Sequence, residues 1–532
     1  MKKITILTLL LLAVAISGSA QFKMSEGSRK VATTMAVIEN LYVDKVDDNK
    51  LAEDAIKSLL EKLDPHSTYI SAEEVKEMNE PLEGNFDGIG ISFNMLTDTL
   101  YVIETIPGGP SEKVGLRAGD KIIYVNDTLI AGVKRSTKFV TSHLKGPKGT
   151  TVNVKVMRRG VPDLLNFKIT RDKIPVYSID ASYMVDNNTG YIRITRFGAT
   201  TSKEFTDAVK KLKSAGMENL ILDLESNGGG YMAPAIDLSD DFLGQGKLIV
   251  YTEGSRQPRR DEIATGKGSF EKGKLVIMIN EYSASASEIL SGAVQDWDRG
   301  VIVGRRSFGK GLVQRPIPLP DESMIRLTVA RYYTPTGRSI QKPYTSGDVM
   351  SYNKDVIERY NRGEMMHADS IHFPDSLKYE TLVNKRIVYG GGGIMPDYFV
   401  PADTSKYTDY FGSIRNRGIL NKVAYGEVDN MRDEIKREFP TKESFYQNYN
   451  VSEELMQRMI AAGEEEKIEF NEEQYNKSKE VLEYQLKGLI GRDVYDMEAL
   501  IKIFNDHSDT FQKAYEIIKD DRQYNQLLSK KK

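Results

Sequence analysis

The stretch Glu281-Tyr-Ser-Ala-Ser-Ala-Ser-Glu-Ile-Leu290 places three serines in alternation between an apolar run and the start of a predicted helix. The apolar run, Lys274-Leu-Val-Ile-Met-Ile-Asn280, predicts a strand, so the serines fall on a strand-to-helix turn. Such a turn exposes a side chain, and the unpaired N–H groups of the helix N-terminus can stabilise an oxyanion. Two alternatives follow: a catalytic serine, or a cap in which Ser285 and Glu288 form an S-x-x-E capping box.

A serine nucleophile needs a base, and histidine is the usual one. The chain has five histidines, and none falls between His143 and His367, although folding could bring one near the turn. A lysine can act instead if burial lowers its pKa toward the working pH. Lys310 is the candidate, because glycines flank it in Ser307-Phe-Gly-Lys-Gly-Leu-Val-Gln314, directly after a predicted strand. A phosphate contact is the alternative, but the P-loop spacing is absent.

Composition and periodicity divide the 532 residues into segments of different character. Strands alternating with helices predict an α/β core, and short β-branched runs between Gly/Pro turns predict a β-rich module before it. The predicted segments are a signal peptide (1–20), an N-terminal helical region (21–82), the β-rich module (83–174), the α/β core (175–403) and a C-terminal helical region (404–532).

The first twenty residues have the basic, apolar and small-residue parts of a secretory signal, with cleavage expected after Ala20. An uncleaved anchor is the alternative, but the apolar run is shorter than the roughly 20 residues of a spanning helix. We therefore expect an exported, periplasmic or otherwise extracytoplasmic protein that is soluble after cleavage. Peripheral proximity to a membrane is compatible with that location.

The chain contains no cysteine, which excludes disulfides, thiolate metal sites and a cysteine nucleophile. Removal of the signal with its two lysines takes the formal charge from −3 to −5. No basic block suggests binding to nucleic acid. The net charge therefore does not indicate which class of molecule the protein binds.

The C-terminal region carries apolar stripes at helical spacing among many charges. One stripe comprises Leu455, Met456, Met459 and Ile460, and another comprises Leu482, Leu486, Leu489 and Ile490. A stripe of this kind must be buried against another surface. We expect these helices at or near the interface of a homo-oligomer, namely a dimer. The alternative is a tail folded onto its own core.

The serine turn, Gln295-Asp296 and the Phe308-Gly-Lys-Gly motif together resemble the C-terminal processing (tail-specific) serine peptidases. The resemblance covers about residues 30–403 and includes the blocks Gly190–Ile194, Leu222–Leu224, Ala330–Gln341 and Gly390–Asp397. It implies a multidomain α/β fold: a crotonase-like α/β peptidase core, a β-rich PDZ domain, and helical N- and C-terminal regions.

Residue by residue, the resemblance implies that Ser285 is the nucleophile, Lys310 the general base and Gln314 a residue that helps orient Lys310. Ser283 and Ser287 would be supporting serines. The backbone N–H groups of Gly229 and Ala286 would stabilise the oxyanion.

One block departs from the family pattern L-D-L-R-x-N-P-G-G. The chain reads Leu222-Asp-Leu-Glu-Ser-Asn-Gly-Gly-Gly230, with Glu225 for the arginine and Gly228 for the proline. A glutamate that faced the site could hold Lys310 protonated, because a nearby opposite charge favours the charged form. We expect Glu225 to point outward instead.

The β-rich module contains a short Gly/Ile motif that looks like the carboxylate-binding loop of a PDZ domain. Its residues are Gly88, Ile89, Gly90 and Ile91, and the later segments Pro110–Asp120 and Ile122–Asn126 look like PDZ elements in the expected order. In that loop, consecutive N–H groups receive a peptide's terminal carboxylate while the peptide adds as a strand.

Together these features predict an exported serine endopeptidase that recognises C-terminal tails and cleaves with a Ser-Lys dyad. Its partners would be proteins or peptides with free C-termini, and no metal or organic cofactor is implied. One alternative is a catalytically degenerate PDZ scaffold that only binds tails. Another, a small-ligand binder or acyl-group enzyme, depends on fold analogy alone.

Overall fold

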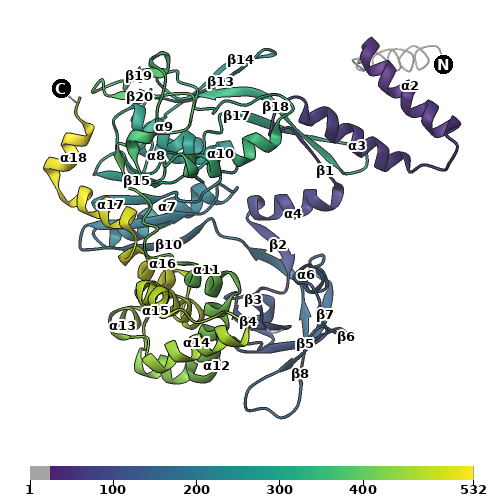
Figure 1. The fold of residues 1–532 in the computed structure, drawn as a ribbon, viewed down its shortest axis with the longest axis vertical. Coiled ribbons are helices and arrows are strands. Elements are labelled where there is room, and N and C mark those ends of the chain that lie inside the picture. The colour runs from purple at the N-terminus through teal and green to yellow at the C-terminus, as the bar shows by residue number, and fades with distance from the viewer. Residues whose placement is uncertain (1–23, 97, 531–532) are drawn as a thin grey trace, which may run out of the picture.

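A computed structural model describes residues 24–96 and 98–530 (Figure 1). It confirms the predicted multidomain α/β fold with a helical C-terminal region. The predicted signal peptide lies outside the described residues. None of the helices within those two ranges is both long and apolar enough to cross a membrane.

The N-terminal region consists of helices and one strand. Its elements are α2 (Glu26–Leu41), α3 (Asp48–Glu61), β1 (Thr68–Ile70) and α4 (Ala72–Glu83). Helix α2 projects away from the rest of the molecule (Figure 1) and buries none of its residues. Strand β1 pairs antiparallel with β18 (Met324–Tyr333), with Thr68 opposite Arg326. The N-terminal region therefore contributes a strand to a sheet of the α/β core.

The β-rich module is a sheet of order β3-β4-β5-β7-β8, with β6 paired to β5. Its elements are β3 (Ile91–Leu96), β4 (Thr99–Thr105), α5 (Pro110–Lys113), β5 (Lys121–Val125), β6 (Thr128–Leu129), α6 (Thr137–Leu144), β7 (Thr151–Met157) and β8 (Leu165–Thr170). In β7, buried Val152, Val154 and Val156 alternate with outward-facing residues, the period of a strand with one face on a core. Strands β2 (Asn85–Gly88) and β9 (Asp172–Pro175) pair where the chain enters and leaves the module.

The core contains a six-stranded sheet of order β10-β11-β12-β15-β16-β21, parallel except for the β10–β11 pair. Its strands are β10 (Ile179–Met184), β11 (Thr189–Ile194), β12 (Asn219–Asp223), β15 (Leu275–Ile279), β16 (Val301–Gly304) and β21 (Tyr398–Phe399). Every residue of β15 is buried, because both faces of the sheet are covered.

Alternate residues of β15 enter two different hydrophobic clusters. Leu275 and Ile277 pack with α7 (Thr201–Ser214), α8 (Met232–Phe242) and α9 (Ala286–Asp296). Val276 and Met278 pack with helices of the C-terminal region.

A second sheet has the order β1-β18-β13-β14, with β17 also paired to β18. Its remaining strands are β13 (Leu248–Gly254), β14 (Gln257–Ile263) and β17 (Leu312–Pro318). Smaller elements follow it: α10 (Val349–Asn361), η1 (Ala368–Ser370), η2 (Asp375–Leu377), β19 (Lys378–Glu380) and β20 (Ile387–Tyr389).

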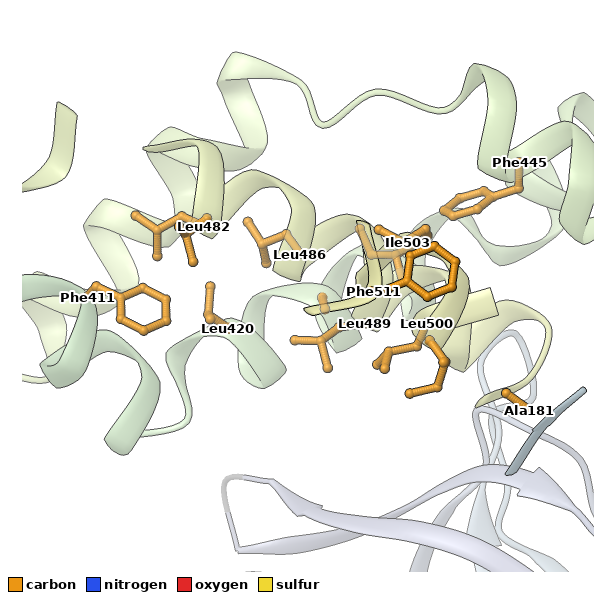
Figure 2. Close-up of a cluster of buried hydrophobic side chains, with 14 of the residues drawn as sticks. Ala181, Phe411, Leu420, Phe445, Leu482, Leu486, Leu489, Leu500, Ile503 and Phe511 are labelled. Atoms are coloured by element: carbon orange, nitrogen blue, oxygen red, sulfur yellow. The ribbon is translucent and has the colours of Figure 1, made fainter. Parts of the chain in front are cut away.

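The C-terminal region is helical throughout its described part. Its helices are α11 (Asp409–Asn416), α12 (Ile419–Glu438), α13 (Lys442–Asn448), α14 (Glu453–Glu465), α15 (Glu472–Val494), α16 (Met497–Asp506), α17 (Asp509–Lys519) and α18 (Asp521–Leu528). The stripe residues Leu482, Leu486 and Leu489 point into a cluster that also contains Ala181 of the core (Figure 2).

The two apolar stripes are buried within the single chain, and the predicted dimer with these helices at or near its interface stays a prediction. All eight stripe residues are at most 9% exposed within the single chain, so they have no free surface for a second copy. They cover one face of the core sheet, as the folded-back alternative predicted.

The C-terminal region also contacts the β-rich module. The ring of Tyr425 on α12 lies 4.2 Å from that of Tyr101 on β4. Asp429 on α12 forms an ion pair with Lys121 at 3.4 Å, and its carbonyl oxygen accepts a hydrogen bond from Arg159 at 2.5 Å. The helices therefore bridge the module and the core.

Candidate functional site

Ser285 lies on the predicted strand-to-helix turn in a strained conformation. Strand β15 ends at Ile279, α9 begins at Ala286, and Ser285 between them has φ 56° and ψ −111°. A positive φ is uncommon for residues other than glycine and concentrates at functional turns. Ser283 and Ser287 are fully buried, and their hydroxyls donate to backbone carbonyls of the neighbouring loop. Ser285 alone of the three serines is partly exposed.

The buried carboxylate of Glu288 joins the turn of Ser285 to the turn of Lys310. Its Oε2 accepts hydrogen bonds from the N–H groups of Ser285 at 2.8 Å and Lys310 at 2.9 Å. Its Oε1 accepts from the N–H of Gly309 at 2.7 Å and from Ser307 Oγ at 2.5 Å. Glu288 therefore makes the contact with Ser285 N–H that a capping box requires, and it also positions the lysine turn.

Tyr332 on β18 is a second shared partner of the two turns. Its hydroxyl donates to the carbonyl oxygen of Ser285 at 3.2 Å and also to that of Lys310. The structure thus brings the predicted nucleophile and base together through backbone contacts.

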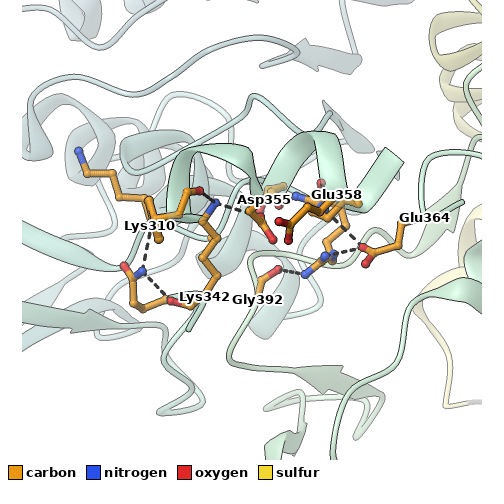
Figure 3. A network of polar contacts seen from close by, with 12 residues as sticks. Lys310, Lys342, Asp355, Glu358, Glu364 and Gly392 are labelled. Atoms are coloured by element: carbon orange, nitrogen blue, oxygen red, sulfur yellow. Dashed lines mark hydrogen bonds and ion pairs between the residues drawn. The ribbon is translucent and has the colours of Figure 1, made fainter. Parts of the chain in front are cut away.

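Lys310 has an unusually low pKa for a lysine. Burial lowers its pKa to about 8, and the charge of Arg326 acts in the same direction, whereas the carboxylates of Glu288 and Asp64 oppose the shift. Its side chain points away from the network around Lys342 and Asp355 (Figure 3). Across residues 24–96 and 98–530, its Nζ has no hydrogen-bond or ion-pair partner. An amine in this state can exchange a proton near neutral pH.

Lys342 supports the lysine turn from behind. Its backbone N–H donates to Gly309 O at 2.9 Å, and its Nζ binds Asp355 at 2.9 Å and lies 4.0 Å from the ring centroids of Phe308 and Tyr352 (Figure 3). Gly309 has φ 89°, and a Cβ there would lie 3.1 Å from that of Lys342. The glycine is therefore required for this close approach.

Gln314 is not a hydrogen-bond partner of Lys310 in the part of the chain that the structure describes. Its Nε2 donates to Leu312 O at 3.1 Å and to Thr328 Oγ1 at 3.4 Å. Thr328 Oγ1 in turn donates to Asp64 at 2.9 Å. An orienting effect of Gln314 on Lys310 would therefore be indirect.

The predicted oxyanion donors differ in availability. Gly229 has φ 100°, and a Cβ there would lie 2.8 Å from that of Ser285, so the loop touches the serine turn. However, the Gly229 N–H already donates to Asn227 Oδ1 at 2.9 Å. The N–H of Ala286, at the start of α9, has no hydrogen-bond partner among the described residues and remains available.

Glu225 is half-buried rather than fully exposed to solvent. It lines a cavity of about 790 Å³ between the core and the C-terminal helices, together with Asp223, Arg305 and Thr510. Burial and the neighbouring Asp223 carboxylate raise the pKa of Glu225 well above its usual range. It is not among the charged groups that shift the pKa of Lys310.

The loop of residues 64–67 also belongs to the site, although no motif in the sequence predicted it. Asp64 is buried and accepts hydrogen bonds from the N–H groups of His66 and Ser67, each at 2.9 Å. The Nε2 of His66 lies 2.9 Å from the hydroxyl oxygen of Tyr352. Burial and the nearby charge of Lys310 lower the pKa of His66 to about 3, so a neutral histidine lies beside the predicted base. The cluster of polar residues directly after an apolar helix was the one feature of the sequence that could have indicated this loop.

The Gly/Ile loop of the β-rich module leaves backbone donors open. Ile89 is buried, and its carbonyl accepts from Ser111, which fixes the loop. Gly90 has φ 75°. The N–H groups of Ile89 and Gly90 have no partner within the described chain, as a loop that binds a carboxylate requires.

Comparisons with known proteins match several parts of the chain to families. Residues 188–351 match Peptidase family S41, residues 88–169 match PDZ domain, and residues 13–74 match Activating protease CtpB N-terminal domain. Residues 410–496 match a family of unknown function, DUF8443.

The chain matches most of the length of its curated relatives. The chain is 37% identical over 339 residues to the carboxy-terminal-processing protease of Bartonella bacilliformis, which spans 63% of this chain and 76% of that protein. It is 35% identical over 339 residues to carboxy-terminal processing protease CtpA of Bacillus subtilis, with 62% and 71% covered, and 32% identical over 335 residues to CtpB of the same organism, with 62% and 69% covered. The chain therefore belongs to peptidase family S41, among the C-terminal processing serine proteases that carry a PDZ domain.

Proposed function

We propose that this chain is an exported endopeptidase that binds the C-terminal tail of its substrate at residues 88–91 and cleaves with a Ser285–Lys310 dyad. The observation that carries the proposal is the Glu288 carboxylate, which accepts hydrogen bonds from the N–H groups of both residues. The strained backbone of Ser285 and the lowered pKa of Lys310 support it.

In the acylation step, the neutral Nζ of Lys310 accepts the proton of Ser285 Oγ while Oγ bonds to the scissile carbonyl carbon. The N–H of Ala286 stabilises the oxyanion, and the N–H of Gly229 would join it after release from Asn227. Collapse breaks the C–N bond, and the proton on Lys310 passes to the leaving amine. In deacylation, the oxygen of a water molecule attacks the ester while Lys310 accepts a proton from that water. Ser285 Oγ takes this proton back from Lys310 when the product acid leaves.

Tail recognition is assigned to the loop 88–91 because its unused N–H groups suit a terminal carboxylate. Export is proposed from the signal-like first twenty residues. A homodimer remains part of the proposal, but its interface must use a surface other than the two buried stripes.

The test is cleavage of an unstructured peptide with a free C-terminus, followed by mass spectrometry. Ser285→Ala and Lys310→Ala should each abolish cleavage while circular dichroism remains unchanged. Ser285→Ala should still bind the peptide. Cleavage by Ser285→Ala at the wild-type rate would refute the nucleophile, and tail binding without cleavage by the wild type would favour the non-catalytic scaffold.

A further inference from the structure

Arg326 on β18 is a half-buried arginine that forms no ion pair with any described carboxylate. Its Nη1 lies 3.6 Å from Sδ of Met78 on α4, and its Nε is buried without a hydrogen-bond partner in the described chain. Other buried arginines of the core, Arg338, Arg359 and Arg386, each pair with a carboxylate. A buried cation without a counter-ion is destabilising, and burial lowers the pKa of Arg326 accordingly.

The charge of the guanidinium acts on the proposed base. Thr328 follows two residues later on the same strand and shares its face, and its hydroxyl contacts the loop of residues 64–67. After burial itself, the charge of Arg326 is the strongest influence on the pKa of Lys310 and it also acts on His66. Arg326 is therefore half-buried on the same face of β18 as the contact with the loop of residues 64–67.

We infer that Arg326 is a subsite for a substrate carboxylate close to the scissile bond. The inference rests on the proposed function, because it places the substrate at Ser285. A guanidinium binds a carboxylate through two parallel hydrogen bonds, and a substrate acid would supply the counter-ion that the described residues do not. The carboxylate can come from an Asp or Glu side chain or from a C-terminus near the cleaved bond.

The inference has a second consequence for Lys310. A bound carboxylate offsets the charge of Arg326, and this favours the protonated form of Lys310 and raises its pKa. The rise of kcat with pH, which reports the enzyme–substrate complex, should therefore have a higher midpoint for an acidic peptide than for its amide counterpart.

The experiment uses the full chain and a peptide whose cleavage site has been mapped by mass spectrometry. One set of peptides carries Glu or Gln at each position flanking the site in turn. Another ends a few residues beyond the site in a free carboxylate or an amide. At one or more positions, wild type should cleave the acid about tenfold faster in kcat/KM, the effect of a charge-assisted bidentate contact. The set that shows the effect identifies the source of the carboxylate.

The matched variants are Arg326→Gln and Arg331→Gln, the second being an exposed arginine on the same strand. The acid-to-amide ratio should fall to about one in Arg326→Gln and stay near ten in Arg331→Gln. Because Arg326 also acts on Lys310, all rates change in the variant, but the ratio within a peptide pair cancels that change. Arg326→Lys, which keeps the charge without the planar fork, should retain an intermediate ratio and serves if Arg326→Gln does not fold.

A wild-type ratio of one in both peptide sets overturns the inference, as does a ratio that survives Arg326→Gln or disappears equally in Arg331→Gln. Ser285→Ala, assayed in parallel, distinguishes failure of the proposed function from failure of the proposed subsite. Cleavage by Ser285→Ala refutes the proposed nucleophile, whereas wild-type cleavage without acid preference refutes only the subsite.

Discussion

The three serines of the turn differ in the hydrogen bonds that their hydroxyl groups make. Ser283 Oγ donates to Leu224 O at 2.7 Å and accepts from Asn280 N–H at 2.9 Å. Ser287 Oγ donates to a backbone carbonyl at 2.8 Å. The outer serines therefore hold the turn against the neighbouring loop, whereas Ser285 Oγ donates to no backbone carbonyl among the described residues.

Alanine at each serine should separate these roles. Ser285→Ala should remove cleavage almost entirely, by a factor of about 10⁴ or more, with little change in stability. Ser283→Ala and Ser287→Ala should keep substantial activity but lose about 1–3 kcal/mol of unfolding free energy, because buried backbone groups lose a partner. Activity assays and thermal unfolding measure the two effects. Equal loss of activity in all three variants would show that the turn is only structural.

The pH dependence should report Lys310. Its pKa is lowered to about 8, and a base works in the neutral form, so kcat/KM should rise with pH, reach half its maximum near pH 8 and level off about one unit higher. A profile measured between pH 6 and 10 tests this. A midpoint near pH 6.5, the ordinary value of histidine, would contradict a lysine base. His66 cannot produce such a midpoint with its pKa lowered to about 3.

Glu288→Gln should move that profile. The carboxylate raises the pKa of Lys310, so its removal should shift the midpoint to lower pH. The new amide N–H would also face hydrogen-bond donors, and we expect about tenfold lower kcat and a loss of about 1–3 kcal/mol in stability. Glu281→Gln is the control, because Glu281 is paired with Arg305 and does not act on Lys310. An unmoved midpoint in Glu288→Gln would refute the electrostatic link.

At the scale of elements, the proposal that the loop between β2 and β3 binds C-terminal tails can be tested with peptides. Because its open N–H groups would hold a terminal carboxylate, amidation of a peptide's C-terminus should weaken binding at least about tenfold. Fluorescence anisotropy with Ser285→Ala measures binding without cleavage.

Gly90→Ala is the matched variant of the loop. Gly90 has φ 75°, which side chains other than glycine rarely adopt, and a Cβ there would lie 3.0 Å from Ile174 Cδ1, so the substitution strains the loop. The variant should lose the preference for the free acid. Equal binding of acid and amide peptides by the unaltered loop would show that it does not bind a terminus.

At the scale of the whole molecule, the C-terminal helices complete the core. Val276 and Met278 of β15 are fully buried against them, and Tyr524 on α18 donates its hydroxyl to Leu275 O. The region is therefore part of the folded unit.

Truncation after Asp403 should unfold the core rather than only change the oligomeric state. Each large apolar side chain that is uncovered on the sheet costs roughly 1.5–3 kcal/mol, and several would be uncovered at once. Circular dichroism and limited proteolysis of the truncated chain measure this. A truncated chain with the wild-type unfolding temperature would contradict a shared core.

Local features were predictable from the sequence. The serine turn, the order of the segments and the glycine-flanked lysine depend on hydrophobic periodicity and turn chemistry within a few residues. The ordered motifs then indicated the family and the pairing of Ser285 with Lys310. The helix, strand or turn on which each of these residues lies could be predicted without knowing any distant contact.

Only the tertiary structure decided which distant surfaces meet. Periodicity showed that the C-terminal stripes must be buried, but the covering surface, the back of the core sheet, is a property of the packed chain. In the same way, the pairing of β1 with β18 places Asp64 against Thr328, and Arg326 has no carboxylate partner among the residues that the structure describes. A side chain's partners across hundreds of residues depend on how whole elements pack, and spacing along the chain does not contain that information.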